Sequence, residues 1–358
     1  MEDITVLVTG AGGSASSNFV DALRLSGNRY RTVGVDASAT HLHLATTDVR
    51  AVVPPARDAR FGGALRAVVH DQGVAVVHAQ PDPDVLRIGM LRDDLGGAAT
   101  FLPAQETLCV AADKNRCAAV LAAAGVSVPE TIAIEALDTA ADSVTTLLRR
   151  HEKVWVRARA GAGSRAALPV RAHEQATAWI AWWVDERGLQ ASDFIVSEFL
   201  PGREFAYQSV WQDGELVAGQ ARERVEYLYG HLTPSGQTST PAVARTVKDP
   251  RIDELAIQAV LAIDPRPQGA FCIDIKENAA GEPCVTEVNA GRFFTTSNFF
   301  AHAGLNMPDV LVRCALGERA PRQASSPLPA DLYWIRMVDM GFVLVPGADL
   351  ERWHRAAQ

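Results

Sequence analysis

The sequence predicts an α/β protein, with a parallel, doubly wound sheet in its first part and an α+β arrangement in its second. Three observations carry this prediction. Short apolar runs alternate with helical patterns through the first hundred residues, as in βαβ units. The turn Gly10-Ala11-Gly12-Gly13 separates the first strand from the first helix. Later strands are joined by the turn signals Asp213-Gly214 and Ala279-Ala280-Gly281.

The first part begins with the strand Ile4–Thr9, an apolar run that contains β-branched residues. Asn18–Leu25 then shows helical spacing through Phe19, Ala22 and Leu23. The other predicted elements of this part are the strands Thr32–Asp36, Val49–Val53 and Val74–Ala79 and the helix Phe61–His70. We place the end of this domain at residue 112, so that it covers residues 1–112.

The second part is expected to cover residues 113–318. Ile252–Ile263 is an amphipathic helix, because its apolar residues follow the 3.6-residue period. Residues 319–358 are read as a proline- and serine-rich linker followed by a strand-like tail, Leu332–Val345. The remaining predicted elements are the helices Asp113–Ala124 and Glu174–Arg187 and the strands Val154–Arg159, Phe194–Leu200, Phe205–Trp211, Ala270–Lys276 and Pro283–Asn289.

Composition excludes several classes of protein. The chain has 358 residues, of which 48% are hydrophobic and 21% charged, so wholesale disorder is excluded. Its 34 basic and 42 acidic residues give a net charge of −8, which argues against non-specific nucleic-acid binding. No apolar run approaches the ~20 residues that span a bilayer. Met1-Glu2-Asp3 is acidic where a signal peptide would have basic residues, so we expect a cytoplasmic protein. We expect neither nucleic-acid nor membrane partners.

The five cysteines indicate buried free thiols in a reducing compartment. Their number is odd and no two have the CxxC spacing, so neither a disulfide framework nor a zinc site is predicted.

The late hairpin carries the strongest chemical signal. If Asp274 pairs with Glu287, the register centres on the turn, and the two carboxylates share a face with their Cβ atoms about 5 Å apart. Asn289 is two residues further on and points to the same side. Facing carboxylates repel unless a cation neutralises them, and oxygen ligands suit Mg²⁺. The alternative is a solvated acidic sheet face with Lys276 as a partner.

Two other segments point to a polyphosphate nucleotide. Val154–Arg159, a strand with alternate cations, runs into Gly161-Ala162-Gly163-Ser164, whose backbone N–H groups can wrap phosphate oxygens. Its spacing is not that of a Walker A loop. In Ile195–Glu204, an apolar strand ends in an acid, a hydrophobic pair and a Pro-Gly turn. Its backbone can bond an adenine edge and Glu204 can hold ribose hydroxyls. Taken alone, each segment can also be an ordinary surface turn.

Together and in this order, the motifs resemble the ATP-grasp superfamily, in its carbamoyl-phosphate-synthase-like branch, over nearly the whole chain. Leu7-Val8-Thr9-Gly10-Ala11-Gly12-Gly13 is similar to the domain that precedes the ATP-grasp fold, and Ala112-Asp113-Lys114 to its usual entry. Ile273-Asp274-Ile275-Lys276 followed by Thr286-Glu287-Val288-Asn289 resembles the family's magnesium signature. The resemblance implies a Rossmann-like pre-ATP-grasp domain followed by an ATP-grasp fold, whose lid subdomain would lie at about residues 150–195.

The resemblance also implies roles for single residues. Lys114 and Arg157 would reach the nucleotide phosphates, although Arg157 stands where the family usually has a lysine. Arg292, shifted one place by Gly291, would stabilise the transferred phosphoryl group. The other implied residues are Gly161, Gly163 and Ser164 for the phosphates, Glu198, Phe199, Leu200, Glu204 and His231 for the rest of the nucleotide, and Asp274, Glu287 and Asn289 for Mg²⁺.

The function implied is an ATP-dependent ligase with ATP and Mg²⁺ as cofactors and small-molecule carboxylate and amine substrates. The carboxylate attacks the γ-phosphate, and an amine attacks the resulting acyl phosphate to give an amide. Arg222 and Arg224, on a strand before the loop Tyr229–Pro241, are candidates to hold the substrate carboxylate with Arg292, and a solvated charged face is their alternative reading. Whether the chain forms a homodimer stays open.

Two rival functions are compatible with parts of the sequence. Gly10-x-Gly12 after the first strand and Asp36 after the second favour a nicotinamide-dependent oxidoreductase, but Ala15 stands at the third glycine position of that fingerprint. Arg157 favours a nucleotide-binding protein that has lost catalysis.

Overall fold

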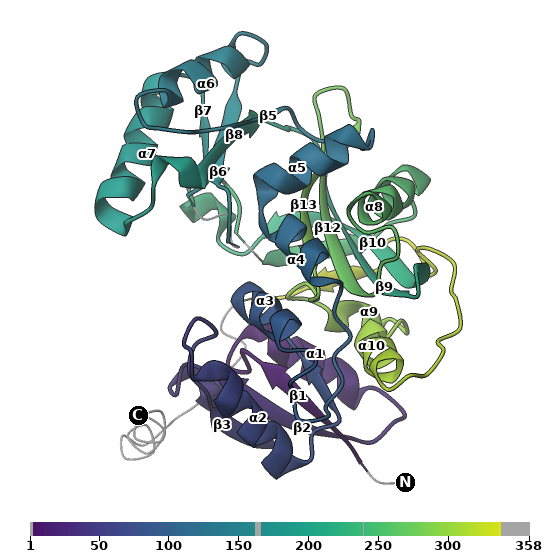
Figure 1. Ribbon diagram of the computed structural model, residues 1–358. Helices are drawn as coiled ribbons and strands as arrows, with labels where there is room; N and C mark the ends of the chain where they lie inside the picture. Colours follow the sequence, from purple (N-terminus) through teal and green to yellow (C-terminus); the bar gives the residue numbers. More distant parts are fainter. Residues whose placement is uncertain (1–2, 162–165, 239, 338–358) are drawn as a thin grey trace.

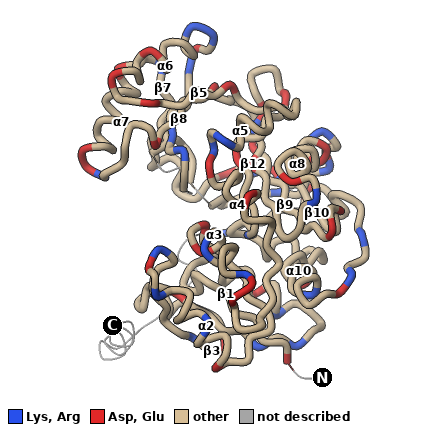
Figure 2. The backbone as a smooth tube through the Cα atoms, in the orientation of Figure 1, with Lys and Arg blue, Asp and Glu red and all other residues tan. Residues whose placement is uncertain are grey.

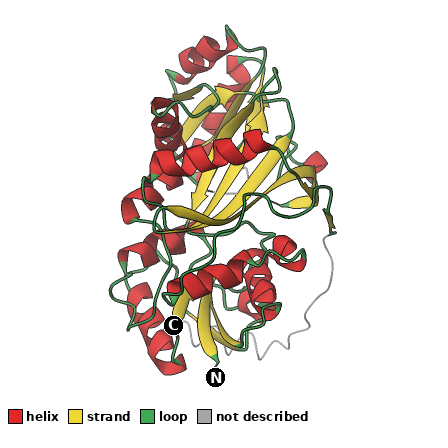
Figure 3. Ribbon diagram, turned by 90° about the vertical axis from the view of Figure 1, so that its right-hand side faces the viewer, coloured by secondary structure: helices red, strands yellow, loops and turns green. Residues whose placement is uncertain are grey.

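The computed structural model describes residues 3–161, 166–238 and 240–337. They form three sheets that lie one above another in Figures 1 and 3. The N-terminal sheet is at the bottom of Figure 1, a six-stranded sheet is in the middle and a smaller sheet is at the top. Acidic and basic residues are interspersed over all three parts in Figure 2.

The N-terminal sheet is parallel throughout and has the strand order β3-β2-β1-β4. Val6 in the central strand pairs with Thr32 on one side and Val76 on the other, and it is fully buried. This arrangement confirms the predicted doubly wound sheet, whose strand order reverses between β1 and β4. In sheets of this type, ligand crevices form at such a point, outside the carboxyl ends of the strands. Its elements are β1 (Ile4–Thr9), α1 (Ser14–Arg24), β2 (Tyr30–Asp36), η1 (His41–Leu44), β3 (Val49–Val52), α2 (Phe61–Gln72), β4 (Val76–His78) and α3 (Asp82–Met90).

The six-stranded sheet is antiparallel and has the order β13-β12-β9-β10-β11-β14. Alternate residues of β9 serve two cores. Phe205 and Tyr207 pack in a core with the helices α4, α5 and α8, whereas Ala206 and Val210 pack in a core with α9 and α10. The elements are α4 (Gln105–Ala112), α5 (Lys114–Ala123), β9 (Glu204–Gln212), β10 (Glu215–Tyr227), η3 (Gly230–Leu232), β11 (Pro241–Thr246), α8 (Pro250–Ile263), β12 (Gly269–Glu277), β13 (Pro283–Ala290), α9 (Asn298–His302), α10 (Met307–Ala315) and β14 (Tyr333–Ile335).

The smaller sheet has the order β5-β8-β6-β7 and is also antiparallel. Two helices, α6 and α7, pack against it around a separate apolar core that includes Val156 and Ile180. On α7, Trp179 stacks on Trp182 and meets Trp183 edge to face, and it donates a hydrogen bond to the carbonyl of Ala166. The elements are β5 (Thr131–Ala133), α6 (Ala140–Leu148), β6 (Val154–Ala158), β7 (Leu168–Val170), α7 (His173–Arg187), η2 (Ala191–Asp193) and β8 (Phe194–Glu198).

Two features qualify the expected domain division, which stays a prediction. The helices α9 and α10 pack on α1, so residues 298–315 share a core with the N-terminal strands. The predicted linker is bound along β10, since the backbone N–H groups of Gln323 and Ser326 donate to Val217 and Gly219. Of the predicted tail, β14 pairs with β11, and residues 338–345 lie outside the described part of the chain.

Candidate functional site

A cavity of about 820 Å³ lies where the three sheets meet, a size typical of small-molecule sites. The turns after β1 and β4 contribute its N-terminal wall, and β6 and the end of β8 contribute the wall of the smaller sheet. The central sheet supplies its floor through β10, β12 and β13. The charged residues of the described lining are Lys114, Arg157, Arg224, Lys276 and Arg292 against Asp82, Glu198, Glu204, Asp274 and Glu287.

Two carboxylates and one amide meet on the β12–β13 hairpin. Asp274 pairs with Glu287 across the two strands, the register expected from the sequence. Asn289 lies two residues beyond Glu287, and its Nδ2 donates to Asp274 Oδ2 at 3.2 Å. Both acidic side chains are largely buried, with 17% and 22% of their surface exposed. The alternative of a solvated acidic face therefore does not describe this hairpin.

The two carboxylates are neutralised by different cations. Glu287 lies 3.3 Å from Lys114 Nζ and 3.9 Å from Arg157 Nη1, whereas Asp274 accepts a hydrogen bond from Arg224. Burial opposes ionisation of Glu287, but its cations outweigh burial and hold the pKa of the carboxyl below its usual value. For Asp274 burial prevails over Arg224, and the pKa is raised.

Lys114 is fixed at the start of α5. The preceding Asp113 caps this helix by accepting from the N–H groups of Asn115 and Arg116, and its two oxygens also bind Arg159 at 2.7 and 2.5 Å. Lys114 Nζ donates to the carbonyl of Gly161 at 2.6 Å. The first glycine of the predicted phosphate loop thus lies beside Lys114, while Gly163 and Ser164 fall outside the described residues.

Arg157 and Arg224 each have a side-chain nitrogen that makes no hydrogen bond within the described residues. Arg157 Nη2 donates to the carbonyl of Thr286 at 2.8 Å, which ties β6 of the smaller sheet to β13. The Nε atoms of Arg157 and Arg224 are buried and have no hydrogen-bond partner in the described part of the chain. Buried donors of this kind are costly unless an anion or water satisfies them, so they suit a site that takes up an anionic ligand.

Arg292 reaches the hairpin despite the extra glycine before it. Gly291 adopts a left-handed conformation with φ +81°, and Arg292 Nη2 then donates to Asn289 Oδ1 at 2.5 Å. The Nε and Nη2 atoms of the same guanidinium also donate to Asp82 of the N-terminal part.

A second region of the cavity contains the aromatic ring of Phe199 and the carboxylate of Glu204, whose oxygens are already hydrogen-bonded. The Phe199 ring has Lys153 Nζ at 4.0 Å and Lys276 Nζ at 5.9 Å from its centre. Glu204, at the start of β9, accepts hydrogen bonds from Lys276, Tyr227 and Gln237. The predicted nucleotide residues Glu198, Phe199, Leu200 and Glu204 all line this region.

Two predicted residues lie away from the lining. Arg222 pairs with Ala206 deeper in the sheet than Arg224, and its guanidinium lies 5.1 Å from the centre of the Phe294 ring, under the cavity wall. Burial lowers the pKa of Arg222 to about 9. His231 is exposed on η3, with its ring 6.5 Å from that of Tyr229. Strand alternation gives the face of a residue but not its depth along the strand, so the sequence pattern alone does not separate Arg222 from Arg224.

The sequence indicated no individual site residue in the N-terminal part. Gln80 and Asp82, between β4 and α3, line the same cavity about two hundred residues before Arg292 in the chain. The Gly10–Ser16 segment also lines it at Gly10 and Gly13 to Ser16. No local sequence pattern predicts these contacts, because they depend on how the two parts of the chain pack together.

The donor chemistry of the hairpin fits Mg²⁺, which takes oxygen ligands and leaves further positions to water and phosphate. Within residues 3–161, 166–238 and 240–337, no group of three or more His, Cys, Asp or Glu side chains is placed to hold a metal ion. Two carboxylates and the amide of Asn289 would therefore form only a partial metal site, which a nucleotide polyphosphate would complete.

Residues 111–296 match the family model of the ATP-grasp domain, and this match covers more than half of the 358 residues. The chain belongs to the ATP-grasp family. The match confirms the family and the fold class that the motifs predicted. The matched range contains Lys114, Arg157, both carboxylates of the hairpin and Arg292. No curated protein matches the chain significantly.

Several solved structures share this ATP-grasp fold at low sequence identity. A biotin carboxylase from Campylobacter jejuni has a TM-score of 0.70 and 15% identity, over 93% of this chain and 74% of that one. An L-amino acid ligase from Bacillus licheniformis has a TM-score of 0.68 and 13% identity, over 89% and 76%. An N5-carboxyaminoimidazole synthetase from Staphylococcus aureus has a TM-score of 0.66 and 13% identity, over 90% of this chain and 80% of that one. Among the described residues, no helix is both long and apolar enough to cross a bilayer.

Proposed function

We propose that this ATP-grasp protein is an ATP-dependent ligase that activates a carboxylate as an acyl phosphate and joins it to an amine. One observation carries the proposal: a partial metal site and several cations meet in one cavity of an ATP-grasp chain. The similarity to structures of an L-amino acid ligase and a biotin carboxylase supports it. The residues concerned are Asp274, Glu287 and Asn289 with Lys114, Arg157 and Arg292.

The residues of the chain would act by positioning and charge. Lys114 and Arg157 bind phosphate oxygens, and Arg292 stabilises the transferred phosphoryl group beside Asn289. When bound by the hairpin residues, Mg²⁺ neutralises phosphate charge. Phe199 and Glu204 both line the cavity, where Phe199 would lie against the base and Glu204 near the ribose.

The reaction requires no nucleophilic side chain. A substrate carboxylate oxygen bonds to the γ-phosphorus while the bond to the β–γ bridging oxygen breaks, and ADP leaves. The amine nitrogen then bonds to the acyl carbon, phosphate leaves and the nitrogen loses one proton. Walls from three sheets restrict the access of water to the acyl phosphate.

The test has two stages. Calorimetry with ATP and Mg²⁺ is expected to show binding, and release of ADP and phosphate is then measured against a panel of carboxylate–amine pairs. Absence of both nucleotide binding and phosphate release would refute the proposal. Turnover with one pair identifies the carboxylate and the nucleophile.

The oxidoreductase alternative finds no support in the N-terminal turn. A Cβ on Gly12 would lie 2.4 Å from the carbonyl oxygen of His41, so this turn is packed against its own chain where a dinucleotide would approach. Both oxygens of Asp36 already accept backbone N–H groups, from Gly12 at 2.9 Å and Ser38 at 2.8 Å. A fluorescence titration with NADH is expected to show no binding.

The proposed setting is the cytoplasm, with small-molecule substrates. All five cysteines are free and four of them are buried, as in proteins of a reducing compartment that also supplies ATP. Light scattering of the purified chain decides between a monomer and a homodimer.

A further inference from the structure

One turn of the N-terminal part holds the segment that follows the β12–β13 hairpin. This turn runs from Gln80 to Val85, and the segment is Gly291 to Phe293. A Cβ on Gly291 would lie 2.7 Å from Val85 Cγ1, so the two segments approach closely at a position where φ is also positive. The backbone on both sides of Arg292 is therefore set by contact with the N-terminal part.

The strongest of these contacts is an ion pair. Asp82 accepts hydrogen bonds from Arg292 Nε through Oδ1 and from Nη2 through Oδ2, the second at 3.3 Å. The same Nη2 donates to Asn289 Oδ1 at 2.5 Å. The Arg292 side chain is 12% exposed and that of Asp82 36%, so the pair is partly buried and is screened less than a surface ion pair. One guanidinium thus connects the N-terminal part to the partial metal site.

A second contact fixes the backbone next to this guanidinium. Gln80 Nε2 donates to the carbonyl of Phe293 at 2.7 Å, and Gln80 Oε1 lies 3.0 Å from His78 Nε2. Burial lowers the pKa of His78 to about 4, so its ring is neutral near pH 7 and can donate to Gln80. The orientation of the Gln80 amide is thereby set from within the N-terminal core.

We infer that Asp82 is a positioning residue, which holds the Arg292 guanidinium at Asn289 so that the N-terminal part completes the reactive centre. This inference rests on the proposed function. An arginine side chain loses substantial rotamer entropy when it is fixed, and the bidentate carboxylate supplies the geometry that offsets this loss. Arg292 also interacts electrostatically with Glu287. Without Asp82, the guanidinium would be left with the attraction of the hairpin carboxylates Glu287 and Asp274, which are the proposed metal ligands.

The experiment compares three variants of the full chain. Asp82→Asn removes the charge, and Asp82→Glu keeps it. Asp21→Asn is the matched control, because Asp21 Oδ2 holds Asn298 and His302 across the same interface without touching Arg292. We expect Asp82→Asn to lower kcat for ATP cleavage at least tenfold with less than a threefold change in KM for ATP. Asp82→Glu is expected to recover part of kcat, and Asp21→Asn to remain within twofold of the parent.

A crystal structure of Asp82→Asn supplies a readout that does not depend on turnover. The expected structure has the Arg292 guanidinium displaced from Asn289. Retention of the bond between Arg292 Nη2 and Asn289 Oδ1 in the variant overturns the inference, as does an equal loss of kcat in Asp82→Asn and Asp21→Asn. If the parent chain binds no ATP with Mg²⁺, the proposed function fails, and the crystal structure still decides the positioning of Arg292.

Discussion

Lys114 Nζ lies 3.3 Å from Glu287 Oε1, so a residue proposed to bind phosphate is paired with one proposed to bind metal. The Lys114 and Glu287 side chains are only 8% and 22% exposed, and Arg157 lies on the other oxygen of Glu287. Each group therefore neutralises the other in this structure. Binding of a metal to the carboxylate and of phosphate to the ammonium would exchange this pair for two new ones.

The exchange predicts that one substitution changes the affinity for ATP differently in the presence and in the absence of Mg²⁺. Glu287→Gln removes a Mg²⁺ ligand but frees Lys114 from its carboxylate. We expect the affinity for ATP with Mg²⁺ to fall at least tenfold, about 1.4 kcal/mol. The affinity for ATP in a chelator is expected to stay equal or to rise. Calorimetry with and without Mg²⁺ measures both.

Glu282→Gln is the control for this variant, since Glu282 is an exposed acid in the turn of the same hairpin. It is expected to bind like the parent under both conditions. An equal loss of affinity with and without Mg²⁺ in Glu287→Gln would contradict the exchange.

Arg157 tests whether catalysis is retained. Its Nη2 binds the carbonyl of Thr286 at 2.8 Å while Nη1 lies 3.9 Å from Glu287, and a lysine has one ammonium for these two directions. We expect Arg157→Lys to lower kcat about tenfold and Arg157→Ala by a hundredfold or more. Arg149→Lys, at an exposed position after α6, serves as the control.

The opposite result has a definite meaning. Turnover that appears only in Arg157→Lys, from a parent that binds ATP without cleaving it, would refute the ligase proposal and favour a catalytically silent nucleotide-binding protein.

The sequence was most informative where a site is local. Asp274, Glu287 and Asn289 could be placed together because strand periodicity and one turn determine the register of a hairpin. The contact of Asp82 with Arg292 could not, because it depends on the packing of the N-terminal part against the central sheet. Arg222 shows an intermediate case: its strand and face follow from the pattern, but Phe294 and Phe300, which cover its guanidinium, are remote in sequence.

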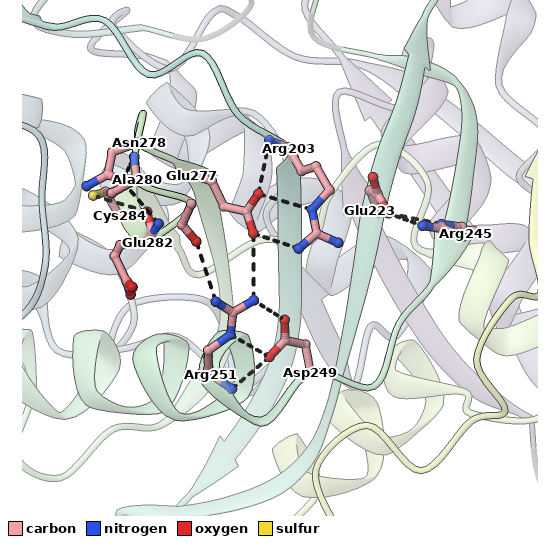
Figure 4. A network of polar contacts seen from close by, with 11 residues as sticks. Arg203, Glu223, Arg245, Asp249, Arg251, Glu277, Asn278, Ala280, Glu282 and Cys284 are labelled. Atoms are coloured by element: carbon pink, nitrogen blue, oxygen red, sulfur yellow. Dashed lines mark hydrogen bonds and ion pairs between the residues drawn. The ribbon is translucent and has the colours of Figure 1, made fainter.

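A close approach behind the nucleotide region predicts a stability effect. A Cβ on Gly202 would lie 2.6 Å from Glu277 Cβ, while Arg203 and Arg251 bind the Glu277 carboxylate, as Figure 4 shows. Gly202→Ala must push this turn away from β12, and we expect a loss of about 2 kcal/mol in the free energy of unfolding. Urea denaturation measures it.

Gly27→Ala is the matched substitution, because no atom lies within 4 Å of its added Cβ. It is expected to leave the urea midpoint nearly unchanged. Equal midpoints for the two variants would show that the turn before β9 yields without cost.

Buried His78 predicts a pH dependence of stability. Burial lowers its pKa to about 4, against about 6.5 in an unfolded chain. Between these values the unfolded state binds a proton that the folded state does not, so this contribution is fully present above about pH 6.5 and is lost as the pH falls towards 4. The loss amounts to about 3 kcal/mol. His78→Phe keeps an aromatic ring against Phe19, 3.9 Å away in the parent, but cannot titrate. We therefore expect the variant to lose less unfolding free energy than the parent between about pH 7.5 and pH 4.5, as measured by urea denaturation. Parallel pH profiles for the two proteins would show that His78 is protonated without cost in the folded state.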